Sequence, residues 1–191
     1  MVTSGVGNRP TIIHDGDPNR RGRPDQCKAA QVTATTTFAA RKTVEQVEEG
    51  LSLAPKFDAD GLIPCITTDA HTGEVLMLGY MNSEALQKTI GTGEAHYWSR
   101  ARQCLWRKGA ISGFTQELVE LRIDDDQDAV WLRVQVADSS ASCHVGYRSC
   151  FYRSVELGGP NGGPARLVFT ESRKTFDPKE IYDDAPNPTQ L

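Results

Sequence analysis

The sequence is poor in apolar residues and lacks any long hydrophobic run. Hydrophobic residues make up 38% of the 191 positions and aromatic residues 7%, which is low for a chain packed entirely into one core. No stretch approaches the ~18 consecutive apolar residues of a membrane span, and the N-terminus lacks the apolar segment of a signal peptide. The sequence predicts a cytoplasmic protein without a membrane partner.

Cysteine usage and net charge exclude further classes. Five cysteines are an odd number, and their spacing is not that of a disulfide scaffold, so reduced thiols and metal ligation are expected. A formal net charge of -4 argues against a general nucleic-acid binder. The cysteines are Cys27, Cys65, Cys104, Cys143 and Cys150.

Composition divides the chain into one domain with flanking segments. The first part is rich in Gly, Pro, Thr, Asn and Arg and predicts a disordered arm. Thr43 and Gln46 then form a capping-box pattern, with Gly50 suited to end a short helix. The predicted parts are a disordered arm over 1–42, a lead-in helix and linker over 43–56, a folded domain over 57–155, and a partly disordered C-terminal extension over 156–191.

The sequence pattern predicts a mainly β domain, within the α+β class, with one or two short helices. Asn82 is expected to cap a helix that runs to about Ile90 and ends at Gly91 and Gly93. The other periodic segments alternate apolar and polar residues or are short apolar runs between turn residues, and they predict strands. These are 62–67, 75–81, 95–100, 114–123, 129–136 and 151–155.

An acidic run lies between two of the predicted strands. In an extended chain, Asp124, Asp126 and Asp128 share one face while Asp125 points to the other, so the run offers two sets of hard ligands. It is not an EF-hand loop, because Ala129 and Gln135 stand where that loop needs Gly and Glu. A solvated acidic turn is the alternative interpretation.

A second concentration of metal ligands follows the acidic run. Cys143 and Cys150 flank a segment that begins with His144. Their spacing is too wide for a zinc ribbon, and a structural zinc site needs four ligands. Buried thiols are the alternative. Taken together, the two stretches predict one metal site or two adjacent ones.

Basic residues surround a tryptophan between two predicted strands. Arg100, Arg102, Arg107 and Lys108 gather near Trp106 in the sequence. This mixture could hold phosphate groups and stack on a base. Solvated hairpin charges are the alternative.

Four motifs together resemble the phosphoribosyl-AMP cyclohydrolases, a family of histidine biosynthesis. The resemblance covers about Phe57 to Arg153 and implies an intertwined, mostly β homodimer whose active site is completed across the subunit interface. It also implies one Zn²⁺ per subunit and Mg²⁺ as cofactors. The motifs are GEVLMLGYMN (73–82), TGEAHYWSRARQCLWRKGAISG (92–113), DDDQD (124–128) and CHVGYRSCFYR (143–153).

The resemblance also implies metal ligands. Asp124, Asp126 and Asp128 match the magnesium acids of the family, and Cys143 and Cys150 match two zinc thiolates. The third zinc thiolate of the family comes from the partner subunit, at the position of Asp125. A carboxylate there implies a harder zinc site, at which Mn²⁺ or Fe²⁺ compete better. Phe114 departs from the family too, since Asn or His is usual there.

The implied reaction opens the adenine ring of phosphoribosyl-AMP by hydrolysis between N1 and C6. His144 is the candidate general base or proton shuttle, with orientation of its loop by hydrogen bonding as the alternative. The residues assigned to substrate binding are Trp98, Ser99, Arg100, Lys108, Ser112 and Arg148.

Two other functions stay open at this point. The first is a related hydrolase with an altered metal or another purine-like substrate, because Asp125 replaces a cysteine. The second is a nucleotide-binding or metal-binding dimer without catalysis. The intact set of His144, two thiols and three alternating aspartates favours an enzyme.

Overall fold

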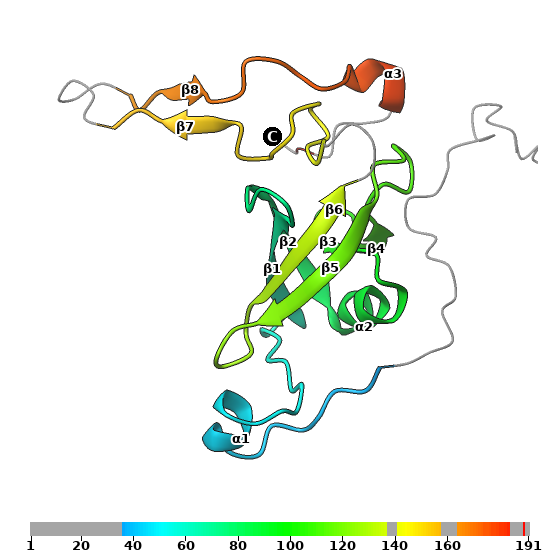
Figure 1. Ribbon diagram of the computed structural model, residues 1–191, viewed down its shortest axis with the longest axis vertical. Coiled ribbons are helices and arrows are strands. Elements are labelled where there is room, and N and C mark those ends of the chain that lie inside the picture. Colours follow the sequence, from blue (N-terminus) through cyan, green and yellow to red (C-terminus); the bar gives the residue numbers. More distant parts are fainter. Residues whose placement is uncertain (1–35, 137–140, 158–163, 184–188, 190–191) are drawn as a thin grey trace, which may run out of the picture.

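A four-stranded sheet forms the centre of the molecule (Figure 1). The computed structural model describes residues 36–136, 141–157, 164–183 and 189. The strands are ordered β2-β1-β6-β5, and β1 pairs with β2 antiparallel and with β6 parallel, while β5 and β6 are antiparallel. Their bounds are β1 Leu62–Asp69, β2 Val75–Asn82, β5 Gln116–Ile123 and β6 Val130–Val136.

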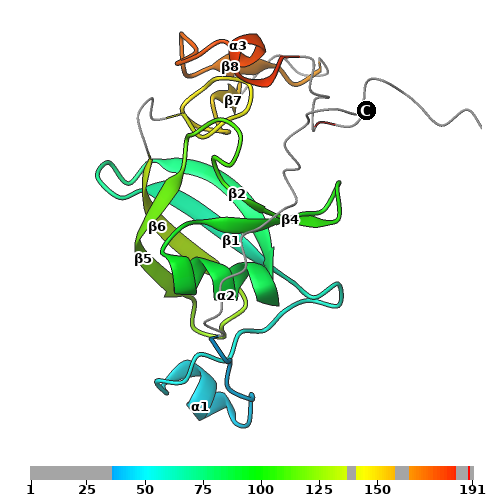
Figure 2. The ribbon, with the colours of Figure 1, turned by 90° about the vertical axis from the view of Figure 1, so that its right-hand side faces the viewer.

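One helix and a β-hairpin cover one face of this sheet (Figure 2). The helix is α2, Ser83–Thr92, and the hairpin consists of β3, His96–Ser99, and β4, Cys104–Arg107. Asn82 caps α2 as predicted, because its side chain accepts a hydrogen bond from the amide of Ala85 at 2.8 Å. The helix runs past the predicted end through Gly91, because only Gly93 takes the left-handed conformation, with φ 70°.

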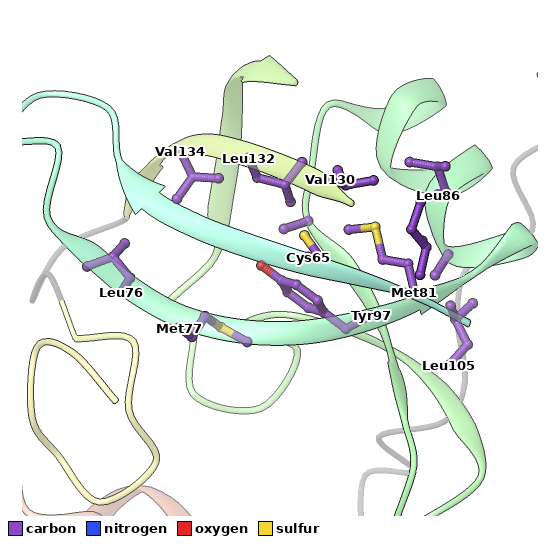
Figure 3. Close-up of a cluster of buried hydrophobic side chains, with 13 residues drawn as sticks. Cys65, Leu76, Met77, Met81, Leu86, Tyr97, Leu105, Val130, Leu132 and Val134 are labelled. Atoms are coloured by element: carbon purple, nitrogen blue, oxygen red, sulfur yellow. The ribbon is translucent and has the colours of Figure 1, made fainter. Parts of the chain in front are cut away.

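The hydrophobic core lies between the sheet and this cover (Figure 3). Strand alternation buries Ile63 and Cys65 of β1 on the core face. On the opposite face, Ile66 is 41% exposed and Leu78 of β2 is 49% exposed. One face of the sheet is therefore open to solvent in the single chain. The buried cluster is Ile63, Cys65, Leu76, Met77, Met81, Ala85, Leu86, Ala95, Tyr97, Leu105, Val130, Leu132 and Val134.

The segment before the sheet contains α1, Val44–Glu48. The Thr43 hydroxyl accepts a hydrogen bond from the amide of Gln46 at 3.0 Å, which confirms the predicted cap. The sequence placed residues up to 42 in the disordered arm, but the end of that range contacts the domain. Phe38 lies 6.2 Å from Phe57 between ring centroids, and the amide of Ala39 donates to the carbonyl of Leu53 at 2.8 Å.

The C-terminal part adds a two-stranded sheet and a third helix. These are β7, Arg153–Val155, β8, Leu167–Phe169, and α3, Pro178–Tyr182, where one or two helices in all were predicted. The segment between β8 and α3 packs on the loop after β6, since the amide of Thr175 donates to the carbonyl of Gly146 at 2.7 Å. Across the described residues, no helix has the length and apolar character needed to cross a membrane.

Candidate active site

The turn between β5 and β6, Asp124–Asp128, brings three carboxylates together; we call it the acidic turn. One oxygen from each of Asp124, Asp126 and Asp128 lies within 4.8 Å of the others. Their grouping was predicted from strand alternation, but the structure achieves it differently. Gln127 adopts the left-handed conformation, with φ 58°, and curls the chain into a tight turn.

Each carboxylate of this group has a partner in the chain. Asp124 accepts hydrogen bonds from the amides of Asp128 and Ala129, at 2.8 and 2.9 Å. The Lys56 ammonium pairs with Asp126 at 2.9 Å and with Asp128 at 3.1 Å, and its hydrogen bond lowers the pKa of Asp126. A cationic group thus already lies between two of the acids. Three converging carboxylates with a cation among them fit a hard divalent ion.

Asp125 is separate from this group. Its side chain is exposed, and it is not one of the three clustered acids. Among the residues that the structure describes, the three acids are the only set of three or more candidate metal ligands that converge. Asp125 therefore takes no part in the carboxylate cluster.

The loop Cys143–Cys150, which we call the thiol loop, is folded back on itself and on β2. The amide of Cys143 donates to the carbonyl of Tyr147 at 3.1 Å, and the amide of Gly146 donates to the carbonyl of Cys143 at 3.0 Å. The amide of Cys150 donates to the carbonyl of Leu76 at 2.7 Å. These bonds bring the first and last residues of the loop together at the end of β2.

The two thiols of this loop interact. A hydrogen bond from the Cys150 thiol, together with a backbone amide at Val145 and the Lys108 ammonium, lowers the pKa of Cys143 to about 6. The same bond raises the pKa of Cys150, and burial adds to this effect. Cys143 therefore loses its proton more readily than an ordinary thiol. A thiolate beside a thiol is a donor pair that suits zinc, whose binding releases the remaining proton.

The acidic turn and the thiol loop lie at opposite ends of the sheet (Figure 1). The acidic turn connects Ile123 to Val130, which pair at one end of the sheet. At the other end, the thiol loop contacts Leu76, and Ser142 just before this loop contacts Gln116. A strand of eight residues such as β5 spans about 25 Å. The prediction of one metal site or two adjacent ones is thus wrong within one chain. The acidic turn precedes β6 and the thiol loop follows it, so the two ligand groups lie at opposite ends of this strand.

A buried hydrogen-bond network connects the core to the thiol loop, and the sequence did not reveal it. The Tyr97 hydroxyl lies 2.8 Å from the Thr67 hydroxyl and donates to the Gln116 side chain at 2.8 Å. Gln116 in turn donates to the Ser142 hydroxyl at 3.1 Å. These four side chains are at most 2% exposed. The only sequence signal was a polar Gln116 at an inward position of its strand.

The network predicts that Tyr97→Phe destabilises the folded protein. Loss of the hydroxyl leaves Thr67 and Gln116 without a buried partner, so the free energy of unfolding should fall by about 1–3 kcal/mol. Urea denaturation measures this change. Tyr80→Phe, which removes a hydroxyl outside the network, is the matched control and should change stability by less than about 0.5 kcal/mol. Equal effects of the two substitutions would contradict the prediction.

The basic residues assigned to the substrate occupy different places. Lys108 is half-buried, and its ammonium donates to the carbonyl of Ser142 beside the thiols, within 5.7 Å of the Trp106 ring. Arg148 pairs with Asp69 at 2.9 Å and with Glu74. Arg148 thereby fixes the thiol loop to the turn between β1 and β2.

The remaining predicted substrate residues lie on the β3–β4 hairpin and just after it. Arg100 is exposed and stacks over the Tyr80 ring at 3.8 Å. The Ser99 hydroxyl accepts hydrogen bonds from Arg102, and Trp98 packs against the core. Ser112 accepts a hydrogen bond from the amide of Phe114 at 3.3 Å. Arg100 is at the hairpin tip, away from Lys108 at its base.

His144 lies in the thiol loop, next to Cys143. Its side chain is half-buried, and the Nε2 atom is shielded from solvent. Histidine changes its protonation near neutral pH, so a proton-transfer role at this position is chemically feasible.

Another histidine, His96, predicts a pH dependence of stability. Burial lowers its pKa below the ordinary value of 6.5, so the unfolded chain takes up the proton more readily. The contribution of neutral His96 to the free energy of unfolding is fully present above about pH 6.5. It is lost as the pH falls below that value. His96→Gln should flatten the decrease in urea stability between about pH 7.5 and 5.5. The exposed His71→Gln is the control, and an equal flattening in it would contradict the assignment.

Comparison with known proteins relates these features to a family. Residues 77–152 match the family model described as phosphoribosyl-AMP cyclohydrolase. A protein of that name from Bradyrhizobium diazoefficiens is 56% identical over 137 residues, which are 72% of this chain and 94% of the relative. The chain belongs to the phosphoribosyl-AMP cyclohydrolase family. A cyclohydrolase from Rhodopseudomonas palustris is 51% identical over 148 residues, 78% of this chain and 98% of that protein.

The range of the cyclohydrolase family model includes both ligand groups, but two residues that contact them lie outside it. The acidic turn and the thiol loop lie within residues 77–152. Lys56, which pairs with the acidic turn, lies before the matched range, and Glu171, which accepts hydrogen bonds from the amides of Arg148 and Ser149, lies after it. Both contacts thus involve residues outside the range of the family model, although the 137-residue match to the Bradyrhizobium protein is long enough to include Lys56.

Proposed function

We propose that this protein hydrolyses the bond between N1 and C6 of the adenine ring of phosphoribosyl-AMP, in histidine biosynthesis. The observation that carries the proposal is that both expected ligand groups, the acidic turn and the thiol loop, lie within residues 77–152, which match the family model. The substrate is a small phosphorylated nucleotide, which suits a cytoplasmic enzyme. A net charge of -4 gives no support to a nucleic-acid partner.

Two metal ions are part of the proposal. Cys143 and Cys150 would hold zinc together with Asp125 of a second subunit, and Asp124, Asp126 and Asp128 would hold magnesium. Bound zinc supplies hydroxide at neutral pH because it lowers the pKa of its water to about 7. The lowered pKa of Cys143 and the convergence of the three acids support these assignments.

The residues of the chain itself bind the substrate and move the proton. N1 of the substrate carries the second ribosyl group, so the ring has positive character and C6 is electrophilic. His144 accepts the proton from the attacking water and returns it to the ring nitrogen. Arg100 and Lys108 contact phosphate, with Trp98, Ser99 and Ser112 nearby on the same hairpin and after it. Arg148, because of its two carboxylate partners, contributes mainly by holding the thiol loop.

An active homodimer is part of the same proposal. The two ligand groups are at opposite ends of one sheet, so in the proposed dimer a second copy brings its acidic turn to the thiol loop of the first (Figure 1). Ile66 and Leu78 on the open sheet face offer apolar surface for such a contact. Sedimentation should show a dimer at micromolar concentration, and a folded, active monomer would exclude this arrangement.

Asp125 favours a second candidate, a cyclohydrolase adapted to another metal. A carboxylate is a harder ligand than a thiolate, so Mn²⁺ or Fe²⁺ would compete better with zinc at a site with two thiolates and one carboxylate. This candidate keeps the substrate and the reaction and changes only the native ion.

The direct test combines an assay with metal analysis. Protein purified without chelator is mixed with phosphoribosyl-AMP, and ring opening is followed by absorbance while bound metals are quantified. The proposal predicts turnover that a chelator abolishes and an added divalent ion restores. Metal-replete protein without turnover would exclude the enzyme and leave a binding role.

A further inference from the structure

The segment before the sheet is attached to the acidic turn through Gln127. This residue is 4% exposed, and its side chain accepts a hydrogen bond from the amide of Ala54 at 2.7 Å. It also donates to the carbonyls of Val47 and Ser52, at 2.9 and 3.2 Å. All polar groups of the Gln127 side chain are therefore used to hold residues 47–54.

Hydrogen bonds of the Lys56 amide and of the Arg41 side chain fix the end of this segment over the turn. The amide of Lys56 donates to the carbonyl of Gln127 at 2.7 Å. Arg41 bridges the same two parts, since its guanidinium donates to the carbonyl of Ala54 at 2.7 Å and to the carbonyl of Asp126 at 2.9 Å. The backbone of Lys56 thus has a fixed position beside the acids.

The Lys56 ammonium occupies one oxygen of each of two acids in the cluster. It lies 2.9 Å from Oδ2 of Asp126 and 3.1 Å from Oδ2 of Asp128. A magnesium ion binds carboxylate oxygens at about 2.0–2.1 Å. An ammonium group and a divalent ion on the same two carboxylates repel each other and compete for their negative charge.

We propose that Lys56 is a tethered cation that occupies the acidic turn and must be displaced when a divalent ion binds, with Gln127 as the positioning residue that holds it there. The inference rests on the proposed role of the acidic turn as a divalent-ion site. It assigns to the segment that carries Lys56 the function of setting how tightly that ion is held.

The first test measures ion affinity directly. Metal-free full-length protein is titrated with Mn²⁺ while free Mn²⁺ is followed by electron paramagnetic resonance. Lys56→Met should bind Mn²⁺ about fivefold more tightly, a change of about 1 kcal/mol, because two ion pairs no longer compete. Lys42→Met removes the same charge from an exposed site on the same segment and should stay within about twofold of wild type.

The second test follows Lys56 itself. Acetylation of individual lysines, read by mass spectrometry, should become severalfold faster at Lys56 when Mg²⁺ is added, while Lys42 keeps its rate. Equal Mn²⁺ affinity of wild type and Lys56→Met, or an Mg²⁺-independent rate at Lys56, would overturn the inference and leave the proposed function intact. Absence of Mn²⁺ binding in both proteins would overturn the inference together with the proposed magnesium site.

Discussion

Cys143→Ala is expected to lower kcat/KM for phosphoribosyl-AMP by at least about 10³-fold, with loss of bound zinc. The Cys150 thiol and Lys108 lower the pKa of Cys143, so its removal takes away a readily ionised sulfur donor from the proposed zinc site. The fold should remain, because the thiol loop is fixed by backbone bonds to Leu76 and by Arg148. Steady-state kinetics and zinc content of the purified variant measure both effects.

A free thiol in the core provides the matched control. Cys65 is fully buried between β1 and its neighbours, and burial raises its pKa to about 12, so it stays protonated. Cys65→Ala should cost about 1 kcal/mol of stability from the small cavity and leave zinc content and kcat/KM within about twofold. If Cys143→Ala behaved like Cys65→Ala, the thiol loop would not be a metal site.

Asp125→Ala is expected to remove most activity and most of the zinc. The side chain is exposed on the acidic turn and stands apart from the three clustered acids, so its loss should leave their ion affinity within about threefold. Zinc affinity should fall by about 10-fold or more, because one of three protein ligands is gone. Metal competition with a chromogenic chelator, run beside the kinetic assay, separates the two ions.

Two further variants make this experiment specific. Asp125→Cys should tighten zinc and reduce the advantage of Mn²⁺ or Fe²⁺, because a thiolate is the softer ligand. Asp60→Ala removes an exposed aspartate from the turn before β1 and should leave metal content and activity unchanged. Full activity and zinc content in Asp125→Ala would show that Asp125 is not a ligand.

Local features of the chain were readable from its sequence, because short-range periodicity and caps determine them. The strand alternation around Ile63 and Cys65, the Asn82 cap and the position of the acidic turn all follow from neighbouring residues. The separation of the acidic turn from the thiol loop follows as well, because β6 lies between them in the chain. The docking of the thiol loop on β2, through the Cys150 amide and the Leu76 carbonyl, does not, because no local pattern encodes it.

Contacts between distant segments were the other features that the sequence did not reveal. Lys56 and Asp126 are 70 residues apart, and neither flanking pattern points to the other. Phe114 stood out as an apolar residue where the family usually has a polar one. The structure accounts for it, because the Phe114 ring lies 5.0 Å from that of Phe176 in the C-terminal segment. The Phe114 ring thus has an aromatic partner in the C-terminal segment.

Subunit complementation tests the central claim that each active site joins the thiol loop of one chain to the acidic turn of another. Cys143→Ala and Asp126→Asn proteins are prepared separately, mixed under conditions that exchange subunits, and assayed on phosphoribosyl-AMP. Each variant alone should be nearly inactive, while random mixing should restore about a quarter of wild-type activity, since half of the dimers then carry one intact site of two. Mixed dimers, verified by native mass spectrometry, that show no more activity than the separate variants would contradict the shared site.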